Sequence, residues 1–213
     1  MKQNHGFCDR PSLQTVFDKV VAISNTPFVL PKTTNKGAPG LYLEERVSIP
    51  TSSACLDCED GEVKMFPVKQ LKTNSYVPKE SVAVTMLNTE TLETQSFEES
   101  RCFRKLSRVL YVPYYRQNDI ITYLRPTIID IASHEHRHLF MQLKKDYDDI
   151  RSAFLQNEKT GLLYTLEGTS KIGKYLQNRT KGAGKGSPKT RAYYLRPAFI
   201  KDNVPIYVSS NNW

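Results

Sequence analysis

Three side chains around a short turn have the types and the spacing to hold a divalent metal. In the segment LDCEDGEVK, Asp57 precedes the turn, and Glu62 and Lys64 follow it. Residues two apart in a strand point to the same side, so Glu62 and Lys64 project together if EVK is extended. Asp57 can then lie opposite Glu62, and two neighbouring carboxylates repel each other unless a cation lies between them. The pattern predicts a site in which that cation is Lys64 or a bound metal.

Mg²⁺ suits this set because it takes one or two carboxylates, a carbonyl and several waters. Asp57, Glu62 and the carbonyl of Val63 can supply these ligands, with Mn²⁺ as a substitute ion, and Lys64 is then left to contact a water and a phosphate. A metal held in this way lowers the pKa of its bound water and neutralises charge on phosphorus oxygens, which is the chemistry of phosphodiester hydrolysis. Short acidic strings are common in a chain that is 24% charged, so a solvated hairpin without a metal is the alternative.

The charge of the chain indicates a polyanionic partner. Its 213 residues include 30 Lys and Arg against 22 Asp and Glu, a net charge of +8. Residues 168–201 contain no acidic residue but nine basic ones: Lys171, Lys174, Arg179, Lys181, Lys185, Lys189, Arg191, Arg196 and Lys201. Glycines in TKGAGKGSPKT allow close backbone approach, and several aromatic residues stand nearby, which suits a nucleic-acid backbone with some base contact. The alternative is a basic face that binds nothing charged.

The elements that must position these residues follow from the hydrophobic pattern. Spacings of three and four predict helices at 13–23, 41–47 and 96–106, and a long amphipathic helix within 134–155. Residues 54–68 read as a β-hairpin with Asp60 and Gly61 in its turn, and further strands are predicted at 81–87 and 108–115. Helices around a mixed central sheet make an α/β or α+β fold. We expect one domain, 1–213, with a catalytic lobe at about 1–110 and a DNA-recognition lobe at 111–213.

Six segments, in order, resemble the MutH family, which joins the mismatch-repair nicking endonuclease to Sau-type type II restriction endonucleases. They are NKGAPGLYLEE, LDCEDGEVKMFPVK, KESVAVTML, RKLSRVLYVP, GKYLQNRTKGAGKGS and RAYYLRPAFI. The resemblance runs from about Asn35 to Ile200. It implies the restriction-endonuclease fold with a PD-(D/E)xK centre, Mg²⁺, and cleavage of double-stranded DNA to 5′-phosphate and 3′-hydroxyl ends.

The resemblance also implies roles for single residues of the active centre. Glu62 and Lys64 match the ExK pair, Glu44 matches an additional active-site glutamate, and Lys105 matches a second lysine near the scissile phosphate. The family's metal-binding aspartate falls where this chain has Cys55. A shorter hairpin therefore makes Asp57 the candidate, with Asp60 in reserve because turn chemistry already accounts for it.

For DNA recognition, the resemblance implies a major-groove reading loop. Arg179, Thr180 and Lys181 match this loop, with Arg to guanine and Lys to guanine or phosphate as the sensible roles, and Tyr194 matches a contacting tyrosine. The other expected DNA contacts are Lys36, Lys185, Lys189, Arg191 and Arg196. GATC is the target that the resemblance implies, although Thr180 replaces a proline and HEHRH replaces an acidic helix.

The leading hypothesis is a cytoplasmic type II restriction endonuclease, monomeric or homodimeric, with a companion methyltransferase and no membrane association. The alternatives are a methyl-directed mismatch-repair nickase, a DNA-binding module with a decayed centre, and an RNA-directed protein. Two further metal sites are disfavoured. Cys55 and Cys58 form a CxxC without a second pair of ligands, and His134 and His138, expected four apart on the long helix, lack a third ligand.

Overall fold

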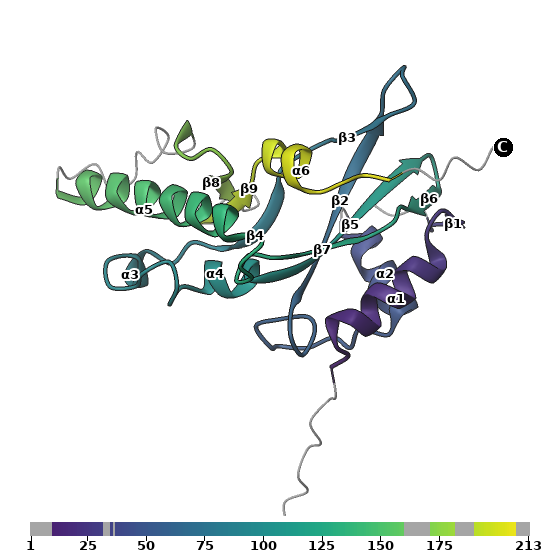
Figure 1. The fold of residues 1–213 in the computed structure, drawn as a ribbon, viewed down its shortest axis with the longest axis horizontal. Coiled ribbons are helices and arrows are strands. Elements are labelled where there is room, and N and C mark those ends of the chain that lie inside the picture. Colours follow the sequence, from purple (N-terminus) through teal and green to yellow (C-terminus); the bar gives the residue numbers. More distant parts are fainter. Residues whose placement is uncertain (1–9, 32–34, 36, 160–170, 182–189, 208–213) are drawn as a thin grey trace, which may run out of the picture.

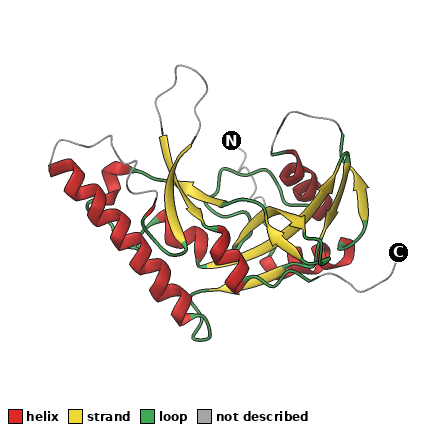
Figure 2. Cartoon of the chain, turned by 90° about the horizontal axis from the view of Figure 1, so that it is seen from above, coloured by secondary structure: helices red, strands yellow, loops and turns green. Residues whose placement is uncertain are grey.

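The structure is a computed structural model that describes residues 10–31, 35, 37–159, 171–181 and 190–207 (Figures 1 and 2). Its helices are α1 (Leu13–Ile23), α2 (Ala38–Val47), α3 (Thr89–Leu92), α4 (Arg101–Leu106), α5 (Arg137–Lys159) and α6 (Pro197–Asn203). Its strands are β1 (Pro27–Val29), β2 (Glu62–Gln70), β3 (Tyr76–Pro78), β4 (Val82–Met86), β5 (Arg108–Gln117), β6 (Ile120–Tyr123), β7 (Thr127–Asp130), β8 (Leu176–Lys181) and β9 (Thr190–Leu195). Among these helices, none is long and apolar enough to cross a membrane.

The strands form two sheets, and β5 is the central strand of the larger one. The larger sheet has the order β1-β6-β5-β2-β3, with β7 also paired to β5, and it is mixed because β2 and β5 run parallel. The smaller sheet is antiparallel, with the order β4-β9-β8. Figure 1 shows α1 and α2 together at one end of the molecule, and α3, α4 and α5 at the other. The predicted fold class, helices around a mixed central sheet, is confirmed.

Strand β5 is buried on both faces, which explains its continuous apolar run. Leu110 and Val112 point into a core built with α1, α2 and β6. Val109 and Tyr111 point the other way, into a core shared with α4, α5, α6 and the smaller sheet. Because β2 lies next to β5, its first residues sit where both helical layers and both cores meet.

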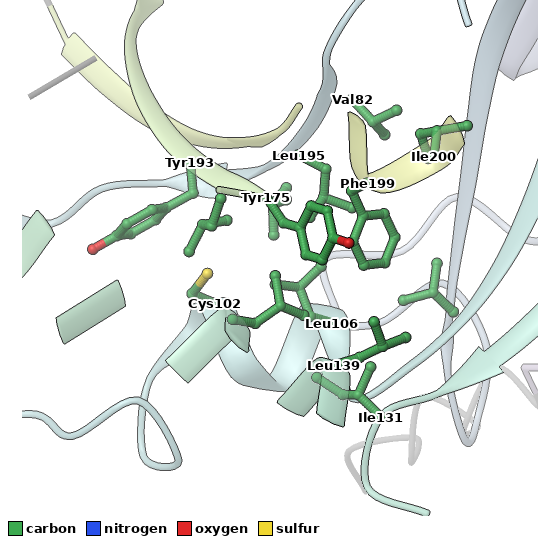
Figure 3. Packing of buried hydrophobic residues seen from close by; sticks show 14 of the residues in the cluster. Val82, Cys102, Leu106, Ile131, Leu139, Tyr175, Tyr193, Leu195, Phe199 and Ile200 are labelled. Carbon is green, nitrogen blue, oxygen red and sulfur yellow. The ribbon is translucent and has the colours of Figure 1, made fainter. Parts of the chain in front are cut away.

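Figure 3 shows how the second core joins distant parts of the chain. Cys102 and Leu106 of α4 and Leu139 of α5 gather with Tyr175 and Phe199 from the C-terminal region. Strand β4 pairs with β9 although they are about a hundred residues apart. The proposed boundary between a catalytic lobe and a recognition lobe, near residue 110, falls within β5, so the division stays a proposal.

Helix α1 begins and ends as the sequence predicts. The Ser12 hydroxyl accepts a hydrogen bond from the Thr15 N–H and caps the helix, while Leu13, Val16 and Val20 form its buried face. At the same end, the Leu13 N–H donates to Asp60 Oδ1 at 2.6 Å. Helix α1 is therefore anchored directly to the turn that precedes β2.

The predicted β-hairpin over 54–68 is wrong, because only its second arm is a strand. Residues 54–61 are irregular, with a tight turn closed by the Cys58 N–H and the Gly61 carbonyl at 2.9 Å. A Cβ on Gly61 would lie 2.8 Å from the Arg108 carbonyl oxygen and 2.7 Å from Leu13 Cδ2, so glycine is required by close packing. The polar side chain in the turn, Asp60, bonds Arg108 as well as α1. Contacts with α1 and β5, rather than pairing with a neighbouring strand, fix the position of this turn.

Other local predictions are confirmed with shifted bounds. The strands predicted at 81–87 and 108–115 are β4 and β5, and the helix predicted at 41–47 is α2, which begins earlier, at Ala38. The helix predicted at 96–106 begins only at Arg101, because the Ser100 hydroxyl caps it by accepting from the Phe103 N–H. The long helix begins at Arg137, so His134 lies before it and the expected four-residue spacing of His134 and His138 on one helix is wrong.

Candidate active site

Glu62, the first residue of β2, is the centre of the candidate site. Its carboxylate is buried, with 1% of the residue exposed. The Nζ atoms of Lys64 and Lys105 both donate to its Oε1, each at 2.7 Å. Its Oε2 is equally buried and has no hydrogen-bond partner among the described residues. Two lysines thus hold one oxygen of Glu62. The other oxygen is buried without a partner, which is costly unless a cation binds it.

Asp57 lies at the open edge of β2. Its Oδ2 accepts a hydrogen bond from the Val63 N–H at 3.0 Å. In an extended strand the N–H and carbonyl of one residue lie on the same edge, so the Val63 carbonyl is directed toward the Asp57 side, away from β5. Asp57 therefore lies against Val63 without the hairpin that was expected to bring it opposite Glu62.

These groups fit a magnesium ion in their chemistry. The unpartnered, buried Glu62 Oε2, the Asp57 carboxylate and the Val63 carbonyl are hard oxygen donors, the type that Mg²⁺ prefers, with water completing its shell. No group of three or more His, Cys, Asp or Glu side chains arranged for a metal occurs among the described residues. The candidate set differs from such a group because it has two carboxylates and a backbone carbonyl. The reserve candidate, Asp60, already has both carboxylate oxygens engaged, by Leu13 and Arg108.

Glu44, on α2, faces the same charges. Its pKa is raised by burial first and then by the negative charge of Asp57, while the positive charge of Lys64 opposes both effects. The resemblance alone assigned this residue, and its electrostatic coupling to Asp57 and Lys64 places it next to the candidate metal ligands. A cation between Glu44 and Asp57 would relieve their repulsion.

Glu44→Gln is expected to raise the thermal stability of the metal-free protein at neutral pH. The pKa of Glu44 is higher in the folded protein than its ordinary value, so the folded state binds this proton more tightly than the unfolded chain does. Stability is therefore lost as the pH rises through that interval, and glutamine removes the loss. Melting in EDTA at about pH 7 and about pH 4 should show a gain only at the higher pH. The exposed neighbour Glu45 provides the control, as Glu45→Gln, and equal behaviour of both variants would contradict the assignment.

A single cleft of about 460 Å³ joins the candidate centre to β8 and β9, which together form the predicted recognition arm. Glu44, Val63 and Lys64 line it from the catalytic side. Arg179 of β8 and Tyr194 of β9 line it from the other side. The two groups of residues are separated in sequence by more than a hundred positions, and the pairing of β4 with β9 brings them to one opening.

The recognition arm carries its predicted residues on paired strands. Arg179, Thr180 and Lys181 end β8 and are exposed, and the Arg179 guanidinium lies 5.7 Å from the centre of the Tyr194 ring. Its neighbour Tyr193 is buried and stacks on Tyr147 with ring centres 5.6 Å apart. The structure thus separates the two tyrosines into one that packs in the core and one that lines the cleft.

Two other predicted DNA contacts are engaged within the protein. Arg191 Nε donates to the Asn178 Oδ1 at 2.6 Å. Arg196 donates to the carbonyls of Gly173 and Ile172, at 2.9 and 3.0 Å, which ties the end of β9 to the approach to β8. The remaining predicted contacts, Lys36, Lys185 and Lys189, lie outside the described residues.

Sequence reasoning did not identify Asp146, which organises the base of the arm. It is 1% exposed and accepts hydrogen bonds from the N–H groups of Lys174, Tyr175 and Leu176, at 2.6 to 2.9 Å. The signal for it was available: Asp146 lies three residues after Leu143 and four before Ile150, so it falls on the apolar face of the helix.

The disfavoured metal sites remain without support. Cys58 is fully buried, and its pKa is raised to about 12, chiefly by burial and then by Asp57, Asp60 and Glu62. Of the two histidines, His134 lines a small pocket with Phe103 and Phe140.

Comparison with known proteins agrees with the resemblance seen in the sequence. The model of the family described as DNA mismatch repair enzyme MutH matches residues 51–144. This segment contains Asp57, Glu62, Lys64 and Lys105, so the predicted resemblance to MutH is confirmed there. No curated protein matches the chain. Among solved structures, the chain is similar to the restriction endonuclease MvaI in complex with its cognate DNA substrate, with a TM-score of 0.39 and 8% identity over 88% of this chain and 92% of that one.

Proposed function

We propose that this protein is a Mg²⁺-dependent, sequence-specific DNA endonuclease of the type II restriction class. The observation that supports it most is the Glu62 carboxylate, with one oxygen held by two lysines and the other buried and unpartnered. That arrangement lies beside a cleft whose far wall presents an arginine and a tyrosine. The segment with the MutH match contains the same centre.

In the proposed reaction, each residue has a separate task. Glu62, Asp57 and the Val63 carbonyl would hold the ion, which supplies an activated water and neutralises charge on the phosphate when it is bound. Lys64, whose Nζ lies 2.7 Å from Glu62 Oε1, would orient that water, and Lys105, which reaches the same oxygen from α4, would contact the scissile phosphate. Glu44 adds negative charge on the side of the cleft facing Asp57. The exposed end of β8 would enter the major groove.

The experiment is incubation of the purified protein with unmethylated plasmid and Mg²⁺, with EDTA as the control, followed by sequencing of the ends. Discrete linear fragments with 5′-phosphates would support the restriction class and give the target. A nicked circle would favour the mismatch-repair nickase, the alternative suggested by the family match. DNA binding without any cleavage, on methylated and unmethylated plasmid alike, would contradict a catalytic centre and favour a binding module.

Arg179→Ala is expected to relax sequence preference at one base pair of the target. Loss of a bidentate contact to guanine costs about 1–3 kcal/mol, roughly 5- to 150-fold in discrimination, while a phosphate contact affects all sequences alike. Cleavage of the target and of its single-base variants measures the ratio. Lys201→Ala, an exposed basic residue on α6 outside the cleft lining, should leave the ratio unchanged. If both variants lower cleavage of all sequences equally, β8 does not read bases.

A further inference from the structure

A second concave surface lies beyond the candidate active-site cleft, on the same sheet. It encloses about 440 Å³ and is lined by the ends of β2 and β5, by the turn after β2 and by Lys79, which follows β3. Its basic residues are Lys69, Lys72, Lys79 and Arg116, and no acidic residue lines it. We call it the basic groove.

Strand register places three of these cations together. Val68 pairs with Tyr115 of β5, so the next residues, Lys69 and Arg116, are neighbours on the opposite face of the sheet. The Lys79 N–H donates to the Pro67 carbonyl at 2.9 Å, which brings Lys79 beside the same part of β2. Like charges on adjacent strands repel, and this arrangement is unfavourable unless an anion offsets it.

Nothing within the described protein neutralises the groove. The side chains of Lys69, Lys72 and Lys79 are exposed and form no hydrogen bond or ion pair with any described residue. By contrast, Lys144 and Lys145 on α5 both pair with carboxylates. The groove is therefore suited to an external polyanion.

The groove continues the candidate active-site cleft. Strand β2 lines the cleft with residues 63–67 and the groove with residues 68–70, and the neighbours Tyr114 and Tyr115 divide between the two in the same way. At about 3.3 Å per residue, Lys69 lies roughly 17 Å along the strand from Lys64.

From this we infer that the basic groove binds the DNA backbone beyond the active-site cleft, away from the scissile phosphate. This inference rests on the proposed function, because the position of the scissile phosphate is taken from it. The protein then grips DNA outside its recognition sequence and binds short duplexes poorly. Contacts of this kind carry no sequence information and depend strongly on salt.

The test compares the wild type with the triple variant Lys69→Ala, Lys72→Ala, Lys79→Ala. Binding is measured in EDTA, without cleavage, on duplexes of about 30 and about 12 base pairs over a range of salt concentrations. On the longer duplex, the triple variant should lose at least about tenfold in affinity, and its logarithmic salt slope should fall by about 2–3, at about 0.9 per phosphate contact. On the shorter duplex the two proteins should be alike. The single variant Lys79→Ala should lose about 0.9 of slope.

The double variant Lys144→Ala, Lys145→Ala, which removes two cations of α5 outside the groove, is the control and should keep the wild-type slope. If the triple variant keeps the wild-type salt slope and the wild type cleaves plasmid, the groove does not bind DNA. The proposed function would then still stand. A reduced slope in a protein that never cleaves DNA would support the groove as a DNA contact and reject the endonuclease.

Discussion

Glu62→Gln is expected to reduce DNA cleavage at least about a thousandfold, about 4 kcal/mol of activation free energy, because the candidate metal ligand is lost. Glutamine keeps the size of the side chain, and its carbonyl can still accept from Lys64 or Lys105. Its amide group, however, would replace the anionic charge that a cation at the Oε2 position requires. Removing the carboxylate altogether, as in Glu62→Ala, would also leave two lysines facing each other in a partly buried site.

DNA binding separates a catalytic loss from a structural one. Glu62→Gln removes a negative charge close to the proposed path of the phosphates, so its affinity for the target in EDTA should equal or exceed that of the wild type. Glu59→Gln is the matched control: the residue is exposed, three positions earlier, and outside the cleft, so cleavage should be unaffected. Equal single-turnover cleavage by Glu62→Gln and the wild type would place the active centre elsewhere.

The sequence predicts the fold where local physics decides it. Helix α1 could be placed because the serine cap and the apolar residues at helical spacing indicate the same start for the helix. Strand β5 could be placed because a strand buried on both faces is apolar throughout. Both signals are contained within about a dozen neighbouring residues.

The hairpin failed because its signal was ambiguous. Asp60 and Gly61 have the composition of a hairpin turn, yet the structure uses them to contact Leu13 and Arg108. The first residues of β2 pair instead with β5, about 45 residues later and parallel, and no local pattern encodes such a pairing. The prediction that Glu62 and Lys64 project together needed only strand alternation, whereas the choice of Asp57 assumed the hairpin.

The long-range parts of the candidate site are beyond local reasoning. Lys105 meets Glu62 across 43 residues, and composition alone gave no reason to choose it from the basic residues of its helix. The resemblance to MutH supplied that choice. Charge alone also did not show the structural role of Arg196: it stays a predicted DNA contact, while its guanidinium donates to two backbone carbonyls within the protein.

Asp146→Ala is expected to destabilise the folded protein by about 3–5 kcal/mol, because it leaves buried hydrogen-bond donors without an acceptor. Three successive backbone N–H groups, from Lys174 to Leu176, converge on this carboxylate at the start of β8, and the Gln142 amide donates to it as well. The preceding Gly173 has a φ of 87°, and a Cβ there would lie 2.0 Å from the Leu176 carbonyl oxygen. The segment therefore has no alternative partner that a small shift could provide.

For a protein of this size, a loss of that magnitude lowers the melting temperature by roughly 6–20 °C. The control is Asp149→Ala, three residues further along α5, where the carboxylate is partly exposed and, among the described residues, pairs with Lys145 alone. Removing that pair should cost at most about 0.5 kcal/mol. If the two alanine variants melt together, the carboxylate does not hold the strand.

A milder substitution of Asp146, to asparagine, tests whether the base of the recognition arm matters for DNA. Strand β8 carries Arg179 only a few residues beyond the N–H groups that Asp146 binds. In Asp146→Asn, which keeps the volume and one acceptor oxygen, the strand should fold but lose its fixed position, and discrimination between the target and its single-base variants should fall. Because Glu62 is untouched and lies on the other side of the cleft, cleavage of the target at saturating protein should change much less than discrimination does. A variant that kept full discrimination while losing stability would show that Asp146 supports the fold and has no part in reading DNA.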